Sequence, residues 1–389
     1  MRSPEARLVF RNADPSCSNA EYGELARAVT DWPRAFGIAE REMATASVWR
    51  ALRQAEAPVP ADAGEAFARG TMIRELRSQH LAHRLAATTR VLAERRIPSL
   101  LLKGASVGAM IDPSFRARPM SDVDLLVHRE DTARASEAII AAGWPMTTDP
   151  LLLELLKDHH HLPHFVDPQL PGVRLELHVQ LWPTRHPFAF DESDLWREAR
   201  PAPTPFAGSM IPSPEHLLVH TSAHFAWQHA MRFGAWRTVR SVAAATGAPG
   251  FSWESFVRVA RASRAATACY WTLRLANAMS GLPVPPRVLA SLAPPGHADW
   301  LDALERHFIA DLVPGEGVAS PSIRLSSWLW RAAIRPGWSG HGGVSPWDFE
   351  NEWGRKAGTA VVETTGERLR RHLASVGDWS RFVTGTLLR

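Results

Sequence analysis

Short alternating strand and helix patterns between residues 98 and 143 constrain the fold of this chain more than any other feature. Residues 100–102 read as a buried strand, which breaks at Gly104 into a helical turn. The segment SDVDLLV at 121–127 reads as a second strand, and a helix that closes at Gly143 follows it. Strands and helices that alternate in such short units predict an α/β core.

Helical and hairpin patterns surround this core. Residues from about 20 to 97 read as helices. The last of these helices has apolar residues at mostly helical spacings, which are Ile73, Leu76, Leu81, Leu85 and Leu92. After Gly143, two runs flank the turn at 168–172 in the manner of an antiparallel hairpin. The second run, VRLELHVQLW, alternates apolar and polar residues and places Glu176 and His178 on its polar face.

Mainly helical patterns continue from residue 213 to the C-terminus. Ser213 caps a helix that has proline at its first position and an acid in its first turn. Breaks between helices are expected at 281–286, 294–297 and 336–347. We therefore expect four parts, which are an N-terminal helical segment at 1–74, the α/β core at 75–197, a proline-rich linker at 198–212 and a mainly helical C-terminal domain at 213–389.

The composition excludes several classes of protein. With 45% apolar and 22% charged residues, the chain is typical of globular proteins. No segment has the roughly 18 uncharged apolar residues of a membrane span, and the N-terminus lacks the apolar stretch of a signal peptide, so a cytoplasmic location is expected. Cys17 and Cys269 form no CxxC pair, which argues against a disulfide framework or a cysteine zinc site. The net charge of +4 suits a small anionic ligand, and no DNA partner is expected.

Two aspartates stand at the start of the second predicted strand. Because Asp122 and Asp124 are two residues apart, both side chains project from the same face. Two unpaired carboxylates there would repel each other and force one to hold a proton. Mg²⁺ removes the conflict, because it takes carboxylate and phosphate oxygens as ligands. With Glu176 as a third carboxylate, two metal ions could lie about 3.5 to 4 Å apart, the arrangement that serves phosphoryl transfer.

A second group of polar residues lies upstream, where a strand turns into a helix. A helix N-terminus with a glycine backbone that permits close approach is a ready phosphate site. Gly104 supplies that approach, and Ser106 adds a hydroxyl donor. Lys103 and Arg118 can neutralise phosphate charge.

Together these segments resemble the nucleotidyltransferase superfamily that includes DNA polymerase β. More narrowly, LLLKGAS, RPMSDVDLLV, the helix ending AAGW and LELH are similar to a poorly characterised bacterial family of nucleotidyltransferases. Members of that family share an LKG turn, an R-P-M-x-D-x-D-L-L-V strand and an acid-x-His strand. The similarity covers roughly residues 75–235 and implies an α+β nucleotidyltransferase core with a small mixed sheet, set between N-terminal helices and a helical C-terminal domain.

The resemblance also implies an activity and a set of site residues. The activity is Mg²⁺-dependent or Mn²⁺-dependent transfer of an NMP from an NTP to an acceptor, with release of pyrophosphate. Asp122, Asp124 and Glu176 would bind the metal, and Glu176 would also act as base for the acceptor. The predicted nucleotide-binding residues are Lys103, Gly104, Ser106, Arg118, Ser121 and His178.

The sequence departs from the family pattern in two places. The superfamily usually has Gly-Ser or Gly-Gly at the turn, whereas Ala105 follows Gly104 here. Arg237 and Arg240 stand where the family tends to carry an acid, which bears on the acceptor site.

Two other functions stay open at this point. A protein of the same fold that has lost its chemistry would bind nucleotide without turnover, although the intact acids argue against it. Histidines suggest a His-ligated metal hydrolase, because His159, His160, His161 and His164 cluster in sequence and His216, His220 and His224 share a helical face. The HLLVH spacing lacks the glutamate of a zinc-protease motif. The sequence does not identify the NTP, the acceptor (a small molecule, a peptide or RNA), the oligomeric state, the pathway or the histidines that line the cleft.

Overall fold

The structure of the full chain is a computed structural model. It describes residues 1–389 except 2, 121, 148–159, 183–186, 314, 317–322 and 335–389, and within the last range Gly377 and Ser380 are described. Ser121, His159 and the break expected at 336–347 therefore lie outside the described residues.

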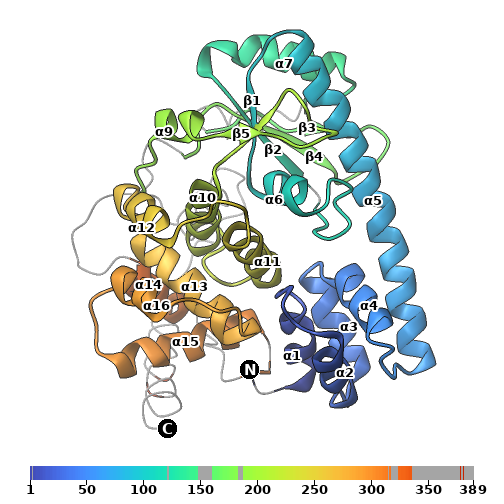
Figure 1. The fold of residues 1–389 in the computed structure, drawn as a ribbon, viewed down its shortest axis with the longest axis vertical. Coiled ribbons are helices and arrows are strands. Elements are labelled where there is room, and N and C mark those ends of the chain that lie inside the picture. The colour runs from blue at the N-terminus through green and yellow to red at the C-terminus, as the bar shows by residue number, and fades with distance from the viewer. Residues whose placement is uncertain are drawn as a thin grey trace, which may run out of the picture.

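A mixed sheet of six short strands carries the three predicted carboxylates, and its arrangement is drawn in Figure 1. The strands are β1 (Ser99–Leu101), β2 (Asp122–Val127), β3 (Phe165–Val166), β4 (Arg174–His178), β5 (Arg200–Pro201) and β6 (Met210–Ile211). Their order in the sheet is β3-β4-β2-β1-β6-β5. β2 runs parallel to β4 and antiparallel to β1, and β3 pairs with β4 as an antiparallel hairpin. The sheet confirms the predicted α+β core, and the hairpin is found where the sequence predicts it.

The segment expected as a linker, 198–212, contributes β5 and β6 to the sheet. β6 pairs parallel with β1, and β5 pairs antiparallel with β6. Each of these strands has two residues, which is too short for an alternating pattern to reveal it in sequence. The division into four domains stays a prediction.

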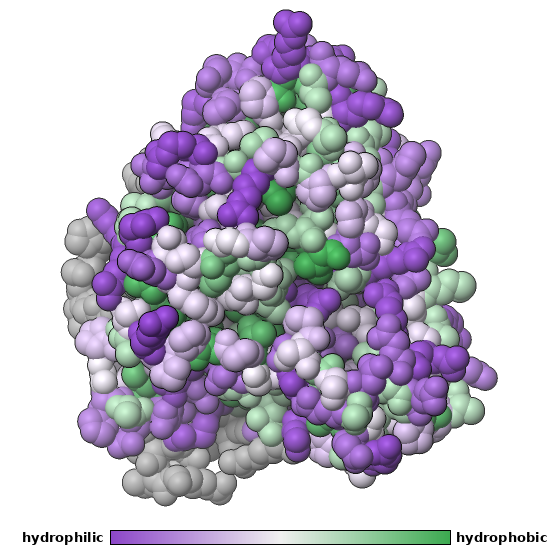
Figure 2. Space-filling model, in the orientation of Figure 1, coloured by the Kyte–Doolittle hydropathy of each residue, from purple (hydrophilic) through white to green (hydrophobic). Residues whose placement is uncertain are grey.

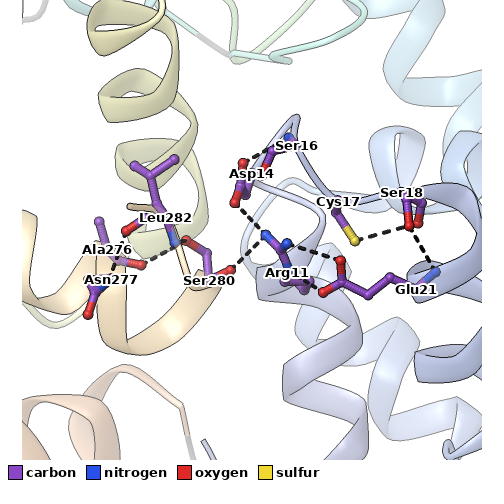
Figure 3. Close-up of polar contacts among 10 residues, drawn as sticks. All are labelled: Arg11, Asp14, Ser16, Cys17, Ser18, Glu21, Ala276, Asn277, Ser280 and Leu282. Atoms are coloured by element: carbon purple, nitrogen blue, oxygen red, sulfur yellow. Dashed lines mark hydrogen bonds and ion pairs between the residues drawn. The ribbon is translucent and has the colours of Figure 1, made fainter. Parts of the chain in front are cut away.

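The N-terminal helices are α1 (Pro4–Arg11), α2 (Asn19–Arg27), α3 (Trp32–Arg41), α4 (Thr45–Gln54) and α5 (Ala61–Glu94). Ser3, Ser18 and Asp31 cap the first three, since each side chain accepts a backbone N–H of the first turn. Figure 3 shows how Arg11 ties these helices to the C-terminal half: its guanidinium donates to the carbonyl of Ser280, 3.1 Å away, and pairs with Asp14 and Glu21.

The long helix α5 runs from the N-terminal helices to the side of the sheet (Figure 1). It packs on α4 near its start and later on α7 (Thr132–Ala141). Leu81, Leu85 and Leu92 are buried, as their spacing predicts. Ile73 and Leu76 are instead 50% and 62% exposed. The middle turns of α5 run between the N-terminal helices, which pack on its start, and the sheet region, which packs on its end (Figure 1).

The C-terminal half is helical, as expected. Its helices are α10 (Pro214–Trp227), α11 (Ala235–Thr246), α12 (Trp253–Ala262), α13 (Ala266–Ser280), α14 (Pro286–Leu292), α15 (Ala298–Leu312) and α16 (Ile323–Ile334). A short helix, α9 (Glu192–Arg197), precedes them and falls within the range 75–197 that was expected to form the α/β core. α10 packs against α11, α12 and α13 and is buried along almost its whole length. The Oγ of Ser213 accepts the backbone N–H of His216, which confirms the predicted start of α10. The breaks at 281–286 and 294–297 are also confirmed.

The sheet separates two hydrophobic clusters, and this decides where the acids point. Leu101 and Leu125 belong to the cluster beneath α5 and α7, whereas Leu126 belongs to the cluster of the helical half. Because side chains alternate along a strand, Asp122 and Asp124 share the face of Leu126. The carboxylates therefore face α10, α11 and α6 (Lys103–Ile111), which pack together on this side of β2.

No helix in the described part of the chain is both long enough and apolar enough to cross a membrane. On the face drawn in Figure 2, hydrophobic residues are scattered among hydrophilic ones. The expected cytoplasmic location stays a prediction.

Candidate active site

The three predicted carboxylates lie on two adjacent strands. Asp122 and Asp124 are on β2, and the parallel register places Glu176 of β4 beside Asp124. The side chains of Asp124 and Glu176 are only 5% and 15% exposed. Carboxylates that are this close and this buried need cations, because neither water nor distance separates their charges.

Asp124 has the best compensated charge of the three. The Nζ of Lys103 donates to its Oδ1 at 2.7 Å, and the Nε2 of His178 donates to the same oxygen at 2.9 Å. Burial alone would raise the pKa of Asp124, but Lys103 and His178 outweigh it and hold the pKa well below its ordinary value. Because of this lowered pKa, Asp124 is ionised at neutral pH. Lys103 itself has a left-handed backbone, with a φ of 42°, at the turn from β1 into α6.

Histidines surround Glu176. The Nε2 atoms of His164, His178 and His161 lie 3.2, 3.8 and 4.0 Å from its carboxylate oxygens. Burial would raise the pKa of Glu176, but the contact with His164 and the positive charge of Lys103 lower it to about 2. Burial also lowers the pKa of His161 to about 4, so this imidazole is neutral at pH 7.

Asp122 carries the remaining like-charge conflict. Burial raises its pKa first, and the negative charges of Asp124 and Glu176 raise it further, against the opposing effect of Lys103 and Arg237. A divalent cation beside these carboxylates would remove the conflict. The donor set therefore fits Mg²⁺.

Ligand atoms gather in two groups within the part of the chain that the structure describes. In each group they all lie within 4.8 Å of one another, and the groups are Asp124, Glu176 and His178, and His161, His164 and Glu176. Asp122 belongs to neither group, although it lines the same cavity as Asp124. The structure thus brings two of the three predicted metal ligands together directly, and it places His178 beside them.

Two arginines, Arg118 and Arg237, line the same cavity of about 80 Å³ as Asp122 and Asp124. Arg118 is 8% exposed, and its Nε donates to the Oγ of Ser241 at 3.3 Å. Burial and the nearby charge of Arg237 lower the pKa of Arg118 to about 9. The Nε of Arg237 is buried without a hydrogen-bond partner among the described residues. Two guanidinium groups that repel each other at one cavity are the arrangement expected of an anion site.

Gly104 gives Arg118 the room that it occupies. A Cβ at position 104 would clash with the Nη1 of Arg118. The guanidinium therefore packs directly on the first turn of α6, next to Lys103. The predicted phosphate turn is thus a place where a helix N-terminus and two cationic side chains meet.

The three histidines of α10 lie in three different environments. His224 lines the cavity with Asp122 and Asp124, whereas His220 is buried against Trp182. His216 lies instead at a separate hollow near Arg197.

Sequence reasoning missed His229 and assigned Arg237 no part in nucleotide binding, although both line the cavity. Burial lowers the pKa of His224 well below its ordinary value, and burial with Arg237 lowers that of His229 to about 3. Both imidazoles are therefore neutral at pH 7. No local pattern in the sequence marks either residue.

Ser106 does not line the cavity. It is fully buried, and its Oγ donates to the carbonyl of Leu101 at 3.0 Å. We expect Ser106→Ala to lower the free energy of unfolding by about 1 kcal/mol, the usual worth of such a bond, and to leave KM for the nucleotide unchanged. Urea unfolding and steady-state kinetics measure the two quantities. A raised KM at unchanged stability would place Ser106 at the nucleotide instead, as the sequence predicts.

The comparison with known families agrees with this geometry. The chain belongs to a family described as uncharacterised nucleotidyltransferase, whose sequence model matches residues 28–281, well over half of the chain. The matched range includes all the residues of the site described above. No curated protein and no solved structure matches the chain. Membership of the family supports a nucleotidyl transfer activity with an NTP as substrate.

Proposed function

We propose that this protein transfers an NMP from an NTP to an acceptor, with Mg²⁺ as cofactor and pyrophosphate as the second product. The observation that supports this most is that Asp122 and Asp124 line one cavity together with Arg118 and Arg237. One cavity therefore offers carboxylates that suit a metal cation and guanidinium groups that suit the phosphates of a nucleotide. We also propose that the protein belongs to the superfamily of DNA polymerase β-like nucleotidyltransferases, which its sequence resembles.

Asp122, Asp124 and Glu176 are assigned to the metal. When bound there, Mg²⁺ supplies positive charge that stabilises the α-phosphate and the departing pyrophosphate, and Mn²⁺ would suit the same oxygens. Glu176 is assigned as a ligand, since its lowered pKa keeps it ionised at neutral pH, and its role as base for the acceptor stays part of the proposal. His178 holds Asp124 in place through its hydrogen bond.

Arg118 and Arg237 are assigned to the β- and γ-phosphates, with the first turn of α6 beneath them. A cavity of about 80 Å³ is far smaller than the roughly 300 Å³ or more of an ordinary small-molecule pocket. We therefore assign the cavity to the metal and the phosphates, and we place the sugar and base outside it. Lys103, which now neutralises Asp124, would turn to the phosphates when the metal takes over that charge.

The test is a survey of labelled nucleotides. The protein is incubated with Mg²⁺, each of the four α-labelled NTPs and an extract of the cells that produce it. We expect one nucleotide to leave its label covalently attached to an acceptor, and EDTA to prevent the transfer. If nucleotide binds and no acceptor is labelled in any of the four reactions, the protein is a binding protein without turnover and the proposal fails.

A further inference from the structure

We propose a second metal site, made of His161, His164 and Glu176, that binds a transition-metal dication such as Zn²⁺. It lies on the β3 side of Glu176, whereas Asp124 lies on the β2 side. The inference concerns metal binding and does not depend on the proposed transfer reaction.

A local shift of register brings the two histidines to one face. Extended by one residue beyond β3, the register of β3 with β4 puts His164 opposite Glu176. His161 forms an antiparallel bridge with His178, although the same register would place Leu162 there. One extra residue therefore lies between the two pairings, as in a β-bulge. Residues three apart point to opposite faces of a regular strand, so this bulge is what turns both imidazoles toward Glu176.

Backbone hydrogen bonds hold this segment against β4. The amide of Leu162 donates to the carbonyl of Leu177 at 2.9 Å. On the other side, the amide of Val179 donates to the carbonyl of His160 at 2.9 Å. The histidines are therefore placed by sheet pairing, which positions ligands more firmly than an unpaired loop does.

The tautomer of His161 suits a metal. Its Nδ1 lies 2.7 Å from the carbonyl oxygen of Leu162, which can only accept, so Nδ1 carries the proton. In the neutral ring the lone pair is then on Nε2, which lies 4.0 Å from the Oε2 of Glu176. Metal-binding histidines commonly donate their other N–H to a backbone carbonyl in this way.

The distances match a small coordination sphere. The Nε2 of His164 lies 3.2 Å from the Oε1 of Glu176, and the three ligand atoms are all within 4.8 Å of one another. Ligand atoms around a tetrahedral zinc are about 3.3 Å apart, so these three atoms would have to draw together by at most about 1.5 Å to close the site. The three side chains are between 8% and 16% exposed, which leaves access for the ion.

The donor set also selects the class of ion. Imidazole suits Zn²⁺ and other transition metals, whereas Mg²⁺ prefers oxygen ligands only. Two imidazole ligands and one carboxylate ligand would leave a net charge of +1 on a bound dication. Glu176 has one oxygen toward His164 and the other toward His178 and His161, so it can serve both sites.

The test is equilibrium dialysis of the full chain against Zn²⁺ in millimolar Mg²⁺, with the metal measured by mass spectrometry. We expect one zinc ion per chain to resist the magnesium. His161→Gln and His164→Gln should each weaken zinc binding about tenfold or more, since each removes a ligand. His83→Gln, which changes an exposed histidine of α5, is the matched control and should bind zinc as the wild type does.

Other outcomes overturn the proposal. The first is a wild type that shows no saturable zinc binding. The second is that His161→Gln and His164→Gln are folded and bind zinc as tightly as the wild type, which would place the ion at Asp124, Glu176 and His178. Visible absorption of the Co²⁺-loaded protein, compared between the wild type and His161→Gln, gives a second readout, because loss of a nitrogen ligand changes the spectrum of the bound ion. Asp122→Asn should keep its zinc and lose transfer, so the failures of the two proposals can be told apart.

Discussion

Replacing Asp122 with asparagine should lower nucleotidyl transfer about a thousandfold or more without lowering the stability of the fold. A bound metal ion contributes several kcal/mol to the transition state, and each 1.36 kcal/mol is a factor of ten in rate. The asparagine side chain would keep the shape of the aspartate and lose the charge that the metal requires. The rate of transfer is measured with the labelled NTP that the survey identifies.

Asp122→Asn should lower the rate of transfer but should not lower stability, because the pKa of Asp122 is raised in the folded protein. A carboxyl group whose folded pKa exceeds its unfolded value destabilises the fold once the pH is high enough to ionise it. Asp122→Asn should therefore melt at the same or a higher temperature than the wild type at pH 7. This difference should vanish below about pH 4, where the wild-type carboxyl is protonated in both states.

The matched control for this variant is Glu137→Gln, which removes one exposed negative charge from α7. It should leave both the rate and the melting temperature unchanged. Asp124 is a less informative target, because its removal would leave Lys103 buried without its partner and would destabilise the fold. Full activity in Asp122→Asn would contradict the assignment of this residue to the metal.

Replacing Arg237 with glutamine should raise KM for the NTP about 10- to 100-fold and change kcat much less. Hydrogen bonds to a charged group contribute roughly 1.5 to 3 kcal/mol, which corresponds to that range. The fold should not suffer, since Arg237 opposes Arg118 electrostatically and its Nε has no partner among the described residues. Steady-state kinetics at low and high salt measure the effect, and the wild type should show the steeper dependence on salt.

Arg240→Gln is the matched control for this prediction. Arg240 lies one turn further along α11, is also partly buried, and lines a different hollow. Its replacement should leave KM unchanged. Equal values of KM for the two variants would show that charge in general, and not the place of Arg237 at the cavity, determines the affinity.

The sequence predicts those parts of the site that depend on local pattern. Asp122 and Asp124 share a face because strands alternate, and Gly104 lies at a strand-to-helix turn that its own segment marks. The placement of Glu176 beside Asp124 follows from parallel pairing, which the sequence can suggest only through the family resemblance. These parts come from segments of ten residues or fewer, where periodicity is informative.

What the sequence misses depends on contacts between distant segments. Arg237 reaches the cavity because α11 packs on α6, and no local pattern encodes that contact. The hydroxyl of Ser106 is taken up by the carbonyl of Leu101, which is visible only in three dimensions. His161 and His164 face Glu176 through a bulge, and a bulge breaks the alternation on which strand prediction rests.

The most direct test of the account is to compare α-labelled with γ-labelled NTP in the same reaction. Nucleotidyl transfer breaks the bond between the α- and β-phosphates. We therefore predict that the α-label moves to the acceptor, that the γ-label leaves in pyrophosphate, and that both processes stop in Asp122→Asn. Transfer of the γ-label to the acceptor would contradict the account, because it would make the protein a kinase.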